Sequence, residues 1–133
     1  MGRTVLSVAA GAVTVYGEGS NGAMIRRAFR MGVNEGAEAE YEHRHRPIWQ
    51  ELEETLLAHG VATYSIYLDP ETRDLFGYVE YESDEQWEGV AGTDVCRRWW
   101  RHMRGLMPSN ADDSPVSRDL REVFHIERAA AGE

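Results

Sequence analysis

The stretch Tyr41-Glu-His-Arg-His-Arg-Pro-Ile-Trp49 places two histidines, two arginines and two aromatic residues within nine positions. His45 and Tyr41 are four positions apart, so on a helix they are neighbours on one face. The pKa of an ordinary histidine lies at about 6.5, so its side chain can give or take a proton at neutral pH. A phenol beside it can orient a substrate hydroxyl or relay a proton. The spacing is equally typical of two amphipathic residues at the edge of a core.

Trp99 and Trp100 are adjacent, so on a helix their side chains diverge by about 100°. One is expected to pack while the other lines a cleft. An indole offers an apolar face and an N–H donor, which suits the C–H faces and hydroxyls of a sugar. Packing in a core or a dimer contact is the competing role. The polar loop of residues 108–117 either forms turn hydrogen bonds or supplies a lid.

The five histidines do not form a recognisable metal site. His43 and His45 would share a side only on a strand, because residues two apart on a helix face different ways. His59, His102 and His125 complete no known ligand spacing. We therefore expect no metal. The 14 basic residues are all arginines, which excludes Schiff-base chemistry on a lysine.

The net charge of −9 argues against nucleic acid or an anionic membrane surface as a partner, since both require a basic footprint. No apolar run approaches the roughly 20 residues of a membrane-spanning helix. The single cysteine, Cys96, excludes an intrachain disulfide. This fits a reducing compartment, and we expect a cytoplasmic protein.

Residues 1–23 differ in composition from the rest of the chain. An apolar run ends in a glycine-rich stretch in which Gly17, Gly19 and Gly22 form G-x-G-x-x-G. A signal peptide and a dinucleotide-binding loop are two interpretations, but no alanine-rich cleavage pattern and no helix follow. We favour an extension, with the domain at 24–127 and a frayed tail at 128–133. A start codon assigned upstream of a true start at Met24 would explain such a segment.

The hydrophobic pattern predicts alternating strands and helices in one domain. Alternation predicts strands, and apolar residues at spacings of three and four predict helices. Pro47 is expected to kink or break the first helix, because proline lacks an N–H and crowds the preceding turn. The predicted elements are a strand at 25–33, a helix at 34–59, strands at 61–69 and 75–82, helical segments at 83–107 and a strand at 120–126.

This order is the βαββαβ pattern of an α+β, ferredoxin-like fold, with an antiparallel sheet and helices on one face. The other face would stay partly apolar, because Phe76 and Tyr78 alternate with the residues that face the helices. A twofold dimer packed sheet to sheet would hide that face. A ligand cleft on the same face is the competing explanation.

From Met24 to about Ile126 the chain resembles the L-rhamnose mutarotase family. The similarity lies in Met24-Ile-Arg-Arg-Ala-Phe29, Tyr41-x-x-x-His45 with Pro47-Ile-Trp49, Tyr64-Ser-Ile-Tyr-Leu-Asp69, Thr93-Asp-Val-Cys-Arg-Arg-Trp-Trp100, Ser114-Pro-Val-Ser117 and Glu122-Val-Phe124. The resemblance implies a homodimer of the dimeric α/β barrel type that interconverts the α and β anomers of L-rhamnose without a cofactor.

The resemblance also implies roles for particular residues. His45 falls where the family has its proton donor, and the sugar contacts fall on Tyr41, Tyr64, Trp99 and Trp100. The sequence departs from the family at Gln50, where proline is expected, and in the 108–117 loop, which reads Asn110-Ala-Asp-Asp. The loop change bears on substrate preference.

Mutarotation needs an acid at the ring oxygen and a base at the anomeric hydroxyl, and we expect His45 to supply the acid, with Tyr41 or water assisting. Two other classes remain open. One is a dimeric ferredoxin-like monooxygenase or haem-degrading enzyme, which would use the same histidine as a haem ligand. The other is a sugar-binding module without catalysis.

Overall fold

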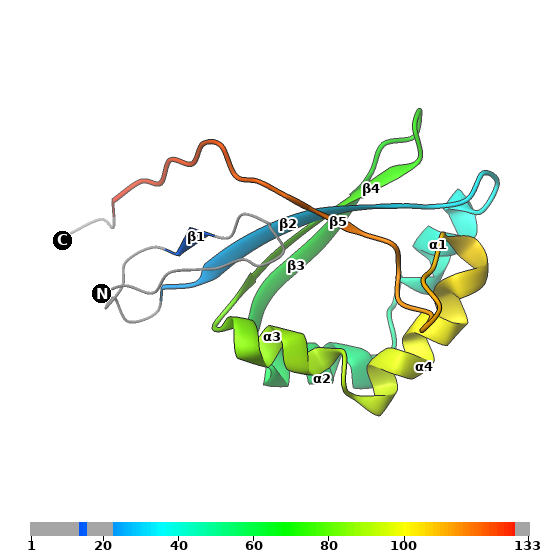
Figure 1. The fold of residues 1–133 in the computed structure, drawn as a ribbon, viewed down its shortest axis with the longest axis horizontal. Coiled ribbons are helices and arrows are strands. Elements are labelled where there is room, and N and C mark those ends of the chain that lie inside the picture. The colour runs from blue at the N-terminus through cyan, green and yellow to red at the C-terminus, as the bar shows by residue number, and fades with distance from the viewer. Residues whose placement is uncertain (1–13, 16–22, 130–133) are drawn as a thin grey trace.

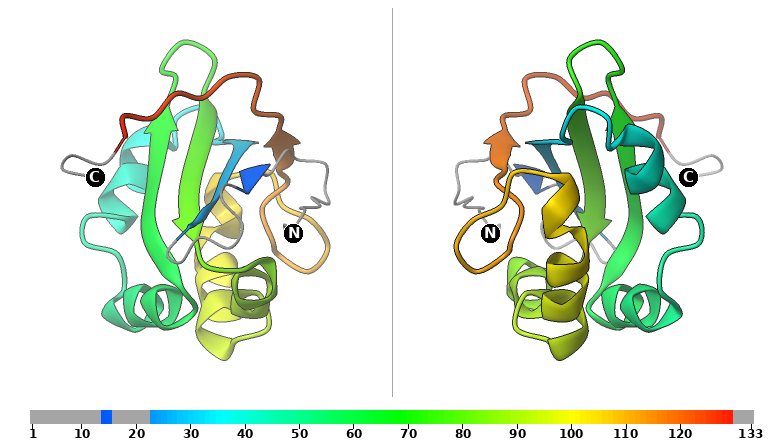
Figure 2. Two further views of the ribbon diagram at one scale, coloured as in Figure 1. Left: turned by 90° about the vertical axis from the view of Figure 1, so that its left-hand side faces the viewer. Right: turned by 90° about the vertical axis from the view of Figure 1, so that its right-hand side faces the viewer.

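An antiparallel sheet carries helices on one face in the computed structural model, which describes residues 14–15 and 23–129 (Figures 1 and 2). Among these residues no helix is both long and apolar enough to cross a membrane. In chain order the elements are β1 (Thr14–Val15), β2 (Ile25–Gly32), α1 (Glu38–Arg44), α2 (Gln50–Ala58), β3 (Val61–Leu68), β4 (Asp74–Tyr81), α3 (Asp84–Val90), α4 (Asp94–Met103), the 3-10 helix η1 (Arg104–Leu106) and β5 (Arg118–Leu120).

The strands are ordered β5–β2–β4–β3, and all of these pairs are antiparallel. β2 pairs with β4 along its whole length, from Ile25 opposite Tyr81 to Gly32 opposite Asp74. The helices α1 and α2 connect β2 to β3, and α3 and α4 connect β4 to β5. This is the ferredoxin-like arrangement, so the fold class predicted from the sequence is confirmed.

The predictions for residues 1–23 fall largely outside the described residues. The glycine-rich stretch at 17–22 and most of the apolar run before it are among the positions that are not described. The short strand β1 is described, and it pairs with the beginning of β2.

Alternation along β4 sets the core face of the sheet. Every second residue from Leu75 to Tyr81 is buried, because successive side chains point to opposite faces of a strand. On the other face Phe76 and Tyr78 are half-buried, and the neighbouring Tyr67 is 65% exposed. The partly apolar outer face expected from the sequence is therefore present.

A β-bulge at the start of β3 alters the predicted pattern. Strict alternation places Ala62 on the same face as Tyr64. The register instead shifts between Val61 and Thr63, so that Val61 pairs with Tyr81 and is buried. Ala62 is exposed, and its predicted orientation was wrong because a bulge inserts one residue that the alternation does not count.

The helix predicted at 34–59 is two helices. α1 ends at Arg44 and α2 begins at Gln50, so the break predicted before Pro47 is confirmed. The predicted start at residue 34 was wrong, since α1 begins at Glu38 with Ala37 as its N-cap. The carbonyl of Asn34 accepts the backbone N–H of Ala37 at 2.9 Å, which forms a turn before the helix starts.

Local sequence signals fix the boundaries of the other helices. Gly60 follows α2 with φ of 88°, a conformation that favours glycine. The Ser83 hydroxyl accepts the backbone N–H of Gln86 at 3.1 Å and caps α3. The Thr93 hydroxyl accepts the backbone N–H of Cys96 at 3.3 Å and caps α4. The start of α4 sets which of its side chains face the sheet.

The last strand is shorter than the predicted 120–126. β5 ends at Leu120, and residues 121–129 form no strand and extend away from the helices (Figure 1). Continuing the register of β5 would bring Glu122 opposite Arg26, where β1 already pairs with β2. The edge of the sheet is occupied there, and Glu122 instead forms an ion pair with Arg26 at 2.6 Å.

Candidate active site

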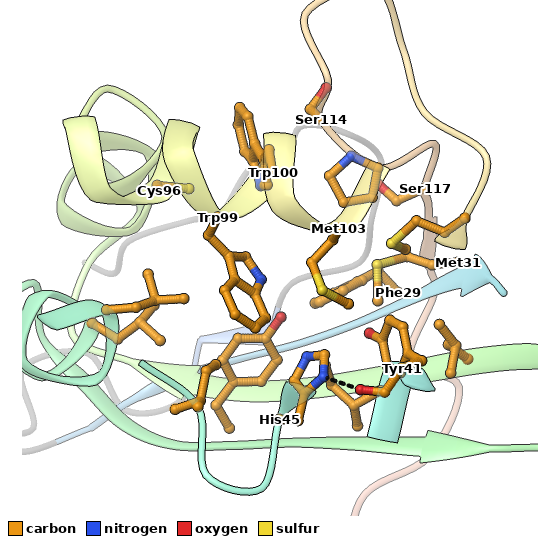
Figure 3. A pocket seen from close by; sticks show the side chains of 18 of the residues that line it. Phe29, Met31, Tyr41, His45, Cys96, Trp99, Trp100, Met103, Ser114 and Ser117 are labelled. Atoms are coloured by element: carbon orange, nitrogen blue, oxygen red, sulfur yellow. Dashed lines mark hydrogen bonds between the residues drawn. The ribbon is translucent and has the colours of Figure 1, made fainter. Parts of the chain in front are cut away.

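A cavity of about 1450 Å³ lies between the inner face of the sheet and the helices (Figure 3). Its walls come from β2, β3, α1, α4 and the 108–117 loop, which are distant in sequence. All five residues predicted for the site line this cavity, namely Tyr41, His45, Tyr64, Trp99 and Trp100. The fold therefore brings all five candidates to one cavity, whereas sequence spacing related only Tyr41 to His45 and Trp99 to Trp100.

His45 occupies the C-cap of α1, just beyond the last helical residue. Its backbone N–H bonds to the carbonyl of Glu42 at 3.0 Å, which leaves the Tyr41 carbonyl without the bond that a continuing helix would give it. His45 Nδ1 lies 2.8 Å from that carbonyl oxygen (Figure 3). A carbonyl oxygen can only accept, so Nδ1 carries a proton and donates it, and Nε2 is left to exchange protons with a ligand.

Aromatic rings surround the half-buried imidazole of His45. The Tyr41 ring centroid lies 4.4 Å away, and the Trp99 ring approaches edge-on at 5.2 Å. Burial lowers the pKa of His45 below 6.5, and the bond to the Tyr41 carbonyl opposes part of that shift. The neutral imidazole is therefore the major form at pH 7.

Tyr41 and Tyr64 contribute two phenols to the cavity. Burial raises the pKa of both hydroxyls, and the Tyr41 hydroxyl raises the pKa of Tyr64 further. Within the described part of the chain, no other group hydrogen-bonds to either hydroxyl. Both phenols remain protonated at neutral pH and can donate to, or accept from, a bound ligand.

Trp99 packs in the core and lines the cavity at the same time. Its side chain is 8% exposed, and its ring lies 5.1 Å from Trp49 and 5.2 Å from His45, centroid to centroid. Trp100 is half-buried and also lines the cavity. The sequence predicted one role for each indole and did not foresee that one residue would have both.

Many of the residues that line the cavity were not predicted from the sequence, and Phe29, Met31 and Met103 are among them. Phe29 and Met31 follow strand alternation on β2, and Met103 belongs to the apolar stripe of α4. Such patterns are typical of any core, so nothing in the sequence distinguishes a cavity wall from ordinary packing.

The 108–117 loop combines the two roles left open by the sequence. Ser114 Oγ and backbone N–H both bond to the Asp112 carboxylate, as in a polar turn. Asp113 is held by Arg104 at 2.9 Å. Asn110 and Ser114 also line the cavity, so the loop closes one side of it.

His43, the other histidine of the Tyr41–Trp49 stretch, does not line the cavity. His43 is exposed on α1, as the helix spacing predicted. Among residues 14–15 and 23–129, no group of three histidine, cysteine or acidic side chains is placed as metal ligands would be. The five residues predicted from the sequence bring one imidazole, two phenols and two indoles to the cavity.

Comparisons with known proteins agree with this geometry. A sequence profile of the L-rhamnose mutarotase family matches residues 26–126. The L-rhamnose mutarotase of Opitutus terrae is 64% identical over 104 residues, which are 78% of this chain and 100% of that protein. The crystal structure of an L-rhamnose mutarotase from Formosa agariphila has a TM-score of 0.71 and 39% identity, and the match covers 77% of this chain and 98% of that one. A dimeric ferredoxin-like protein from an uncultured marine organism has a TM-score of 0.56 at 15% identity, over 81% of this chain and 100% of that one, which concerns the fold alone.

Proposed function

The chain belongs to the L-rhamnose mutarotase family, and on that premise we propose that it is an isomerase that interconverts the α and β anomers of L-rhamnopyranose. The observation that carries the proposal is the hydrogen bond of 2.8 Å from His45 Nδ1 to the Tyr41 carbonyl. It fixes one imidazole tautomer and leaves Nε2 as the proton-transfer atom. Similarity to solved proteins below 25% identity concerns the fold alone and does not support the monooxygenase or haem alternative.

In the proposed reaction the imidazolium form of His45 donates the Nε2 proton to the ring oxygen. The bond from the anomeric carbon to the ring oxygen breaks, and the anomeric hydroxyl gives its proton to water, which Tyr41 assists. The product is the open-chain aldehyde. Rotation about the bond from C1 to C2 presents the other carbonyl face, and ring closure reverses both proton transfers. No atom is gained or lost.

The phenols and indoles are proposed to hold the sugar while the ring opens. Tyr41 and Tyr64 each have a hydroxyl that can reach a sugar oxygen, and Trp99 and Trp100 present apolar faces to its C–H groups. The cavity of about 1450 Å³ is larger than typical small-molecule sites of roughly 300–1,000 Å³. Both the ring and the open chain therefore have room to rotate.

Saturation-transfer NMR on an equilibrium mixture of L-rhamnose anomers tests this function. We expect the protein to accelerate magnetisation exchange between the two anomeric protons in proportion to its concentration. A control sample with the protein heat-denatured gives the uncatalysed rate. Binding of L-rhamnose without faster exchange would instead identify a sugar-binding module, and a Soret band on haem titration would favour the haem alternative.

We also propose that the protein is a cytoplasmic homodimer. The outer sheet face carries Tyr67, Phe76 and Tyr78, and the C-terminal segment exposes Phe124 and Ile126, which are 75% and 77% exposed. A second copy on that face would remove this apolar surface from water. Sedimentation equilibrium is expected to give twice the mass of the chain, and Tyr67→Glu is expected to shift the protein toward monomer. A monomer at micromolar concentration would contradict the proposal.

A further inference from the structure

We propose that Met103 and Met31, with Phe29, form a subsite that recognises the C6 methyl group and makes the enzyme selective for 6-deoxyhexoses. The inference rests on the proposed function and concerns the specificity of the same cavity. L-Rhamnose and L-mannose differ only at C6, which is a methyl group in the first and a hydroxymethyl group in the second. The two sugars therefore isolate the contribution of this wall.

The wall is built by two elements that face each other. Phe29 and Met31 are two residues apart on β2, so they share its inner face. Met103 lies one turn after Trp99 on α4, so the two side chains share a helix face. Figure 3 shows Met103, Met31 and Phe29 grouped beside Tyr41 and His45. Each of the three is at most 8% exposed, and all three line the cavity.

The ring of Phe29 occupies space that is open because the residue opposite it on β4, Gly77, has no side chain. Gly77 pairs with Phe29, and a Cβ atom at that position would overlap the phenylalanine ring. The ring therefore lies across β4 and makes an edge contact with Tyr64, with a centroid distance of 6.2 Å. Gly77 therefore helps to position both Phe29, an apolar wall residue, and Tyr64, a proposed sugar-binding residue.

The covalent structure of the sugar places its methyl group near this wall. C5 is bonded to the ring oxygen and also carries C6, so a group that protonates the ring oxygen must lie close to the C6 substituent. Beside His45 and Tyr41 the cavity wall includes the thioethers of Met103 and Met31 and the phenyl ring of Phe29. Such groups offer no strong hydrogen-bond donor or acceptor. A methyl group is matched by this surface, whereas a hydroxyl would lose its water contacts without replacement.

A pocket of apolar groups discriminates only moderately against an added hydroxyl, by about 10–100-fold. We therefore expect kcat/KM for anomer exchange to be about 10–100-fold higher for L-rhamnose than for L-mannose. Met103→Gln retains the length of the side chain and adds an amide, so this ratio should fall toward unity. Met103→Leu keeps the wall apolar, and its ratio should stay within about threefold of wild type.

Saturation-transfer NMR measures both sugars with the three proteins, and circular dichroism checks that each variant is folded. Equal kcat/KM for the two sugars in the wild type would overturn the subsite, as would the same ratio in the glutamine and leucine variants. If Met103→Gln does not fold, Met31→Gln and Met31→Leu provide the same comparison from β2. Failure of the proposed function is distinct, because then the wild type accelerates neither sugar.

Discussion

His45→Asn is expected to slow catalysed anomer exchange in L-rhamnose by about 10²–10⁴-fold while the fold stays intact. Asparagine is smaller than histidine, and its amide N–H₂ retains a donor for the Tyr41 carbonyl. It has no group that titrates near neutral pH, so it cannot transfer the proton. His45 is only half-buried, so the substitution leaves the main core packing in place. Saturation-transfer NMR at saturating sugar measures the remaining rate.

The chain supplies a matched control two residues away. His43→Asn makes the same chemical change on the exposed side of α1, outside the cavity. It should leave the exchange rate within about twofold of wild type, since surface substitutions of this kind have small effects. Equal losses of exchange rate in the two variants would indicate an effect on helix stability. A wild-type exchange rate in His45→Asn would show that His45 does not transfer the proton.

Helix spacing predicted that His45 shares a side with Tyr41 and that His43 does not, and in the structure His45 lines the cavity while His43 is exposed. The reason for the prediction was only partly right. The prediction placed both residues inside one long helix. In the structure His45 is a C-cap residue whose backbone is still close to helical, with φ of −95° and ψ of −4°. The four-residue spacing to Tyr41 is therefore preserved at the point where the helix stops.

The break near Pro47 has a consequence that sequence reasoning did not reach. Proline predicts that the helix ends, because it has no N–H to donate. It does not predict that the imidazole of His45 donates a hydrogen bond to the Tyr41 carbonyl, to which the backbone N–H of His45 does not bond. That bond depends on where the last turn tightens, and a hydrophobic pattern carries no such detail.

Strand order was predictable, whereas the apolar wall of the cavity was not. Alternation and turn signals define the strands, and the ferredoxin-like order follows from their sequence. Met31 and Met103 are 72 positions apart, and they meet only because β2 and α4 pack on the same side of the sheet. The bulge near Ala62 shows the same limit, since one additional residue changes which side chains face inward.

The pH dependence of anomer exchange is the second large effect that the structure predicts. In the proposed mechanism His45 donates its proton from the imidazolium form, and burial disfavours that charged form. Its pKa in the protein is therefore below 6.5, so the active form dominates only at pH values below that pKa. We expect kcat/KM to be constant at low pH and to fall about tenfold per pH unit above the pKa. From pH 7 to pH 9 the fall should be about 100-fold.

The profile distinguishes His45 from the two phenols of the site, because the phenols do not titrate in this range. The pKa values of the Tyr41 and Tyr64 hydroxyls are raised above their usual value of 10, so both stay protonated. Exchange is measured by NMR between pH 5 and pH 9, with the protein-free rate subtracted at each pH and folding checked by circular dichroism. A rate that rises through this range would assign the neutral imidazole as the base at the anomeric hydroxyl. The proton for the ring oxygen would then have to come from a phenol. In that case Tyr41→Phe should abolish the activity, whereas in the donor mechanism the activity depends mainly on His45.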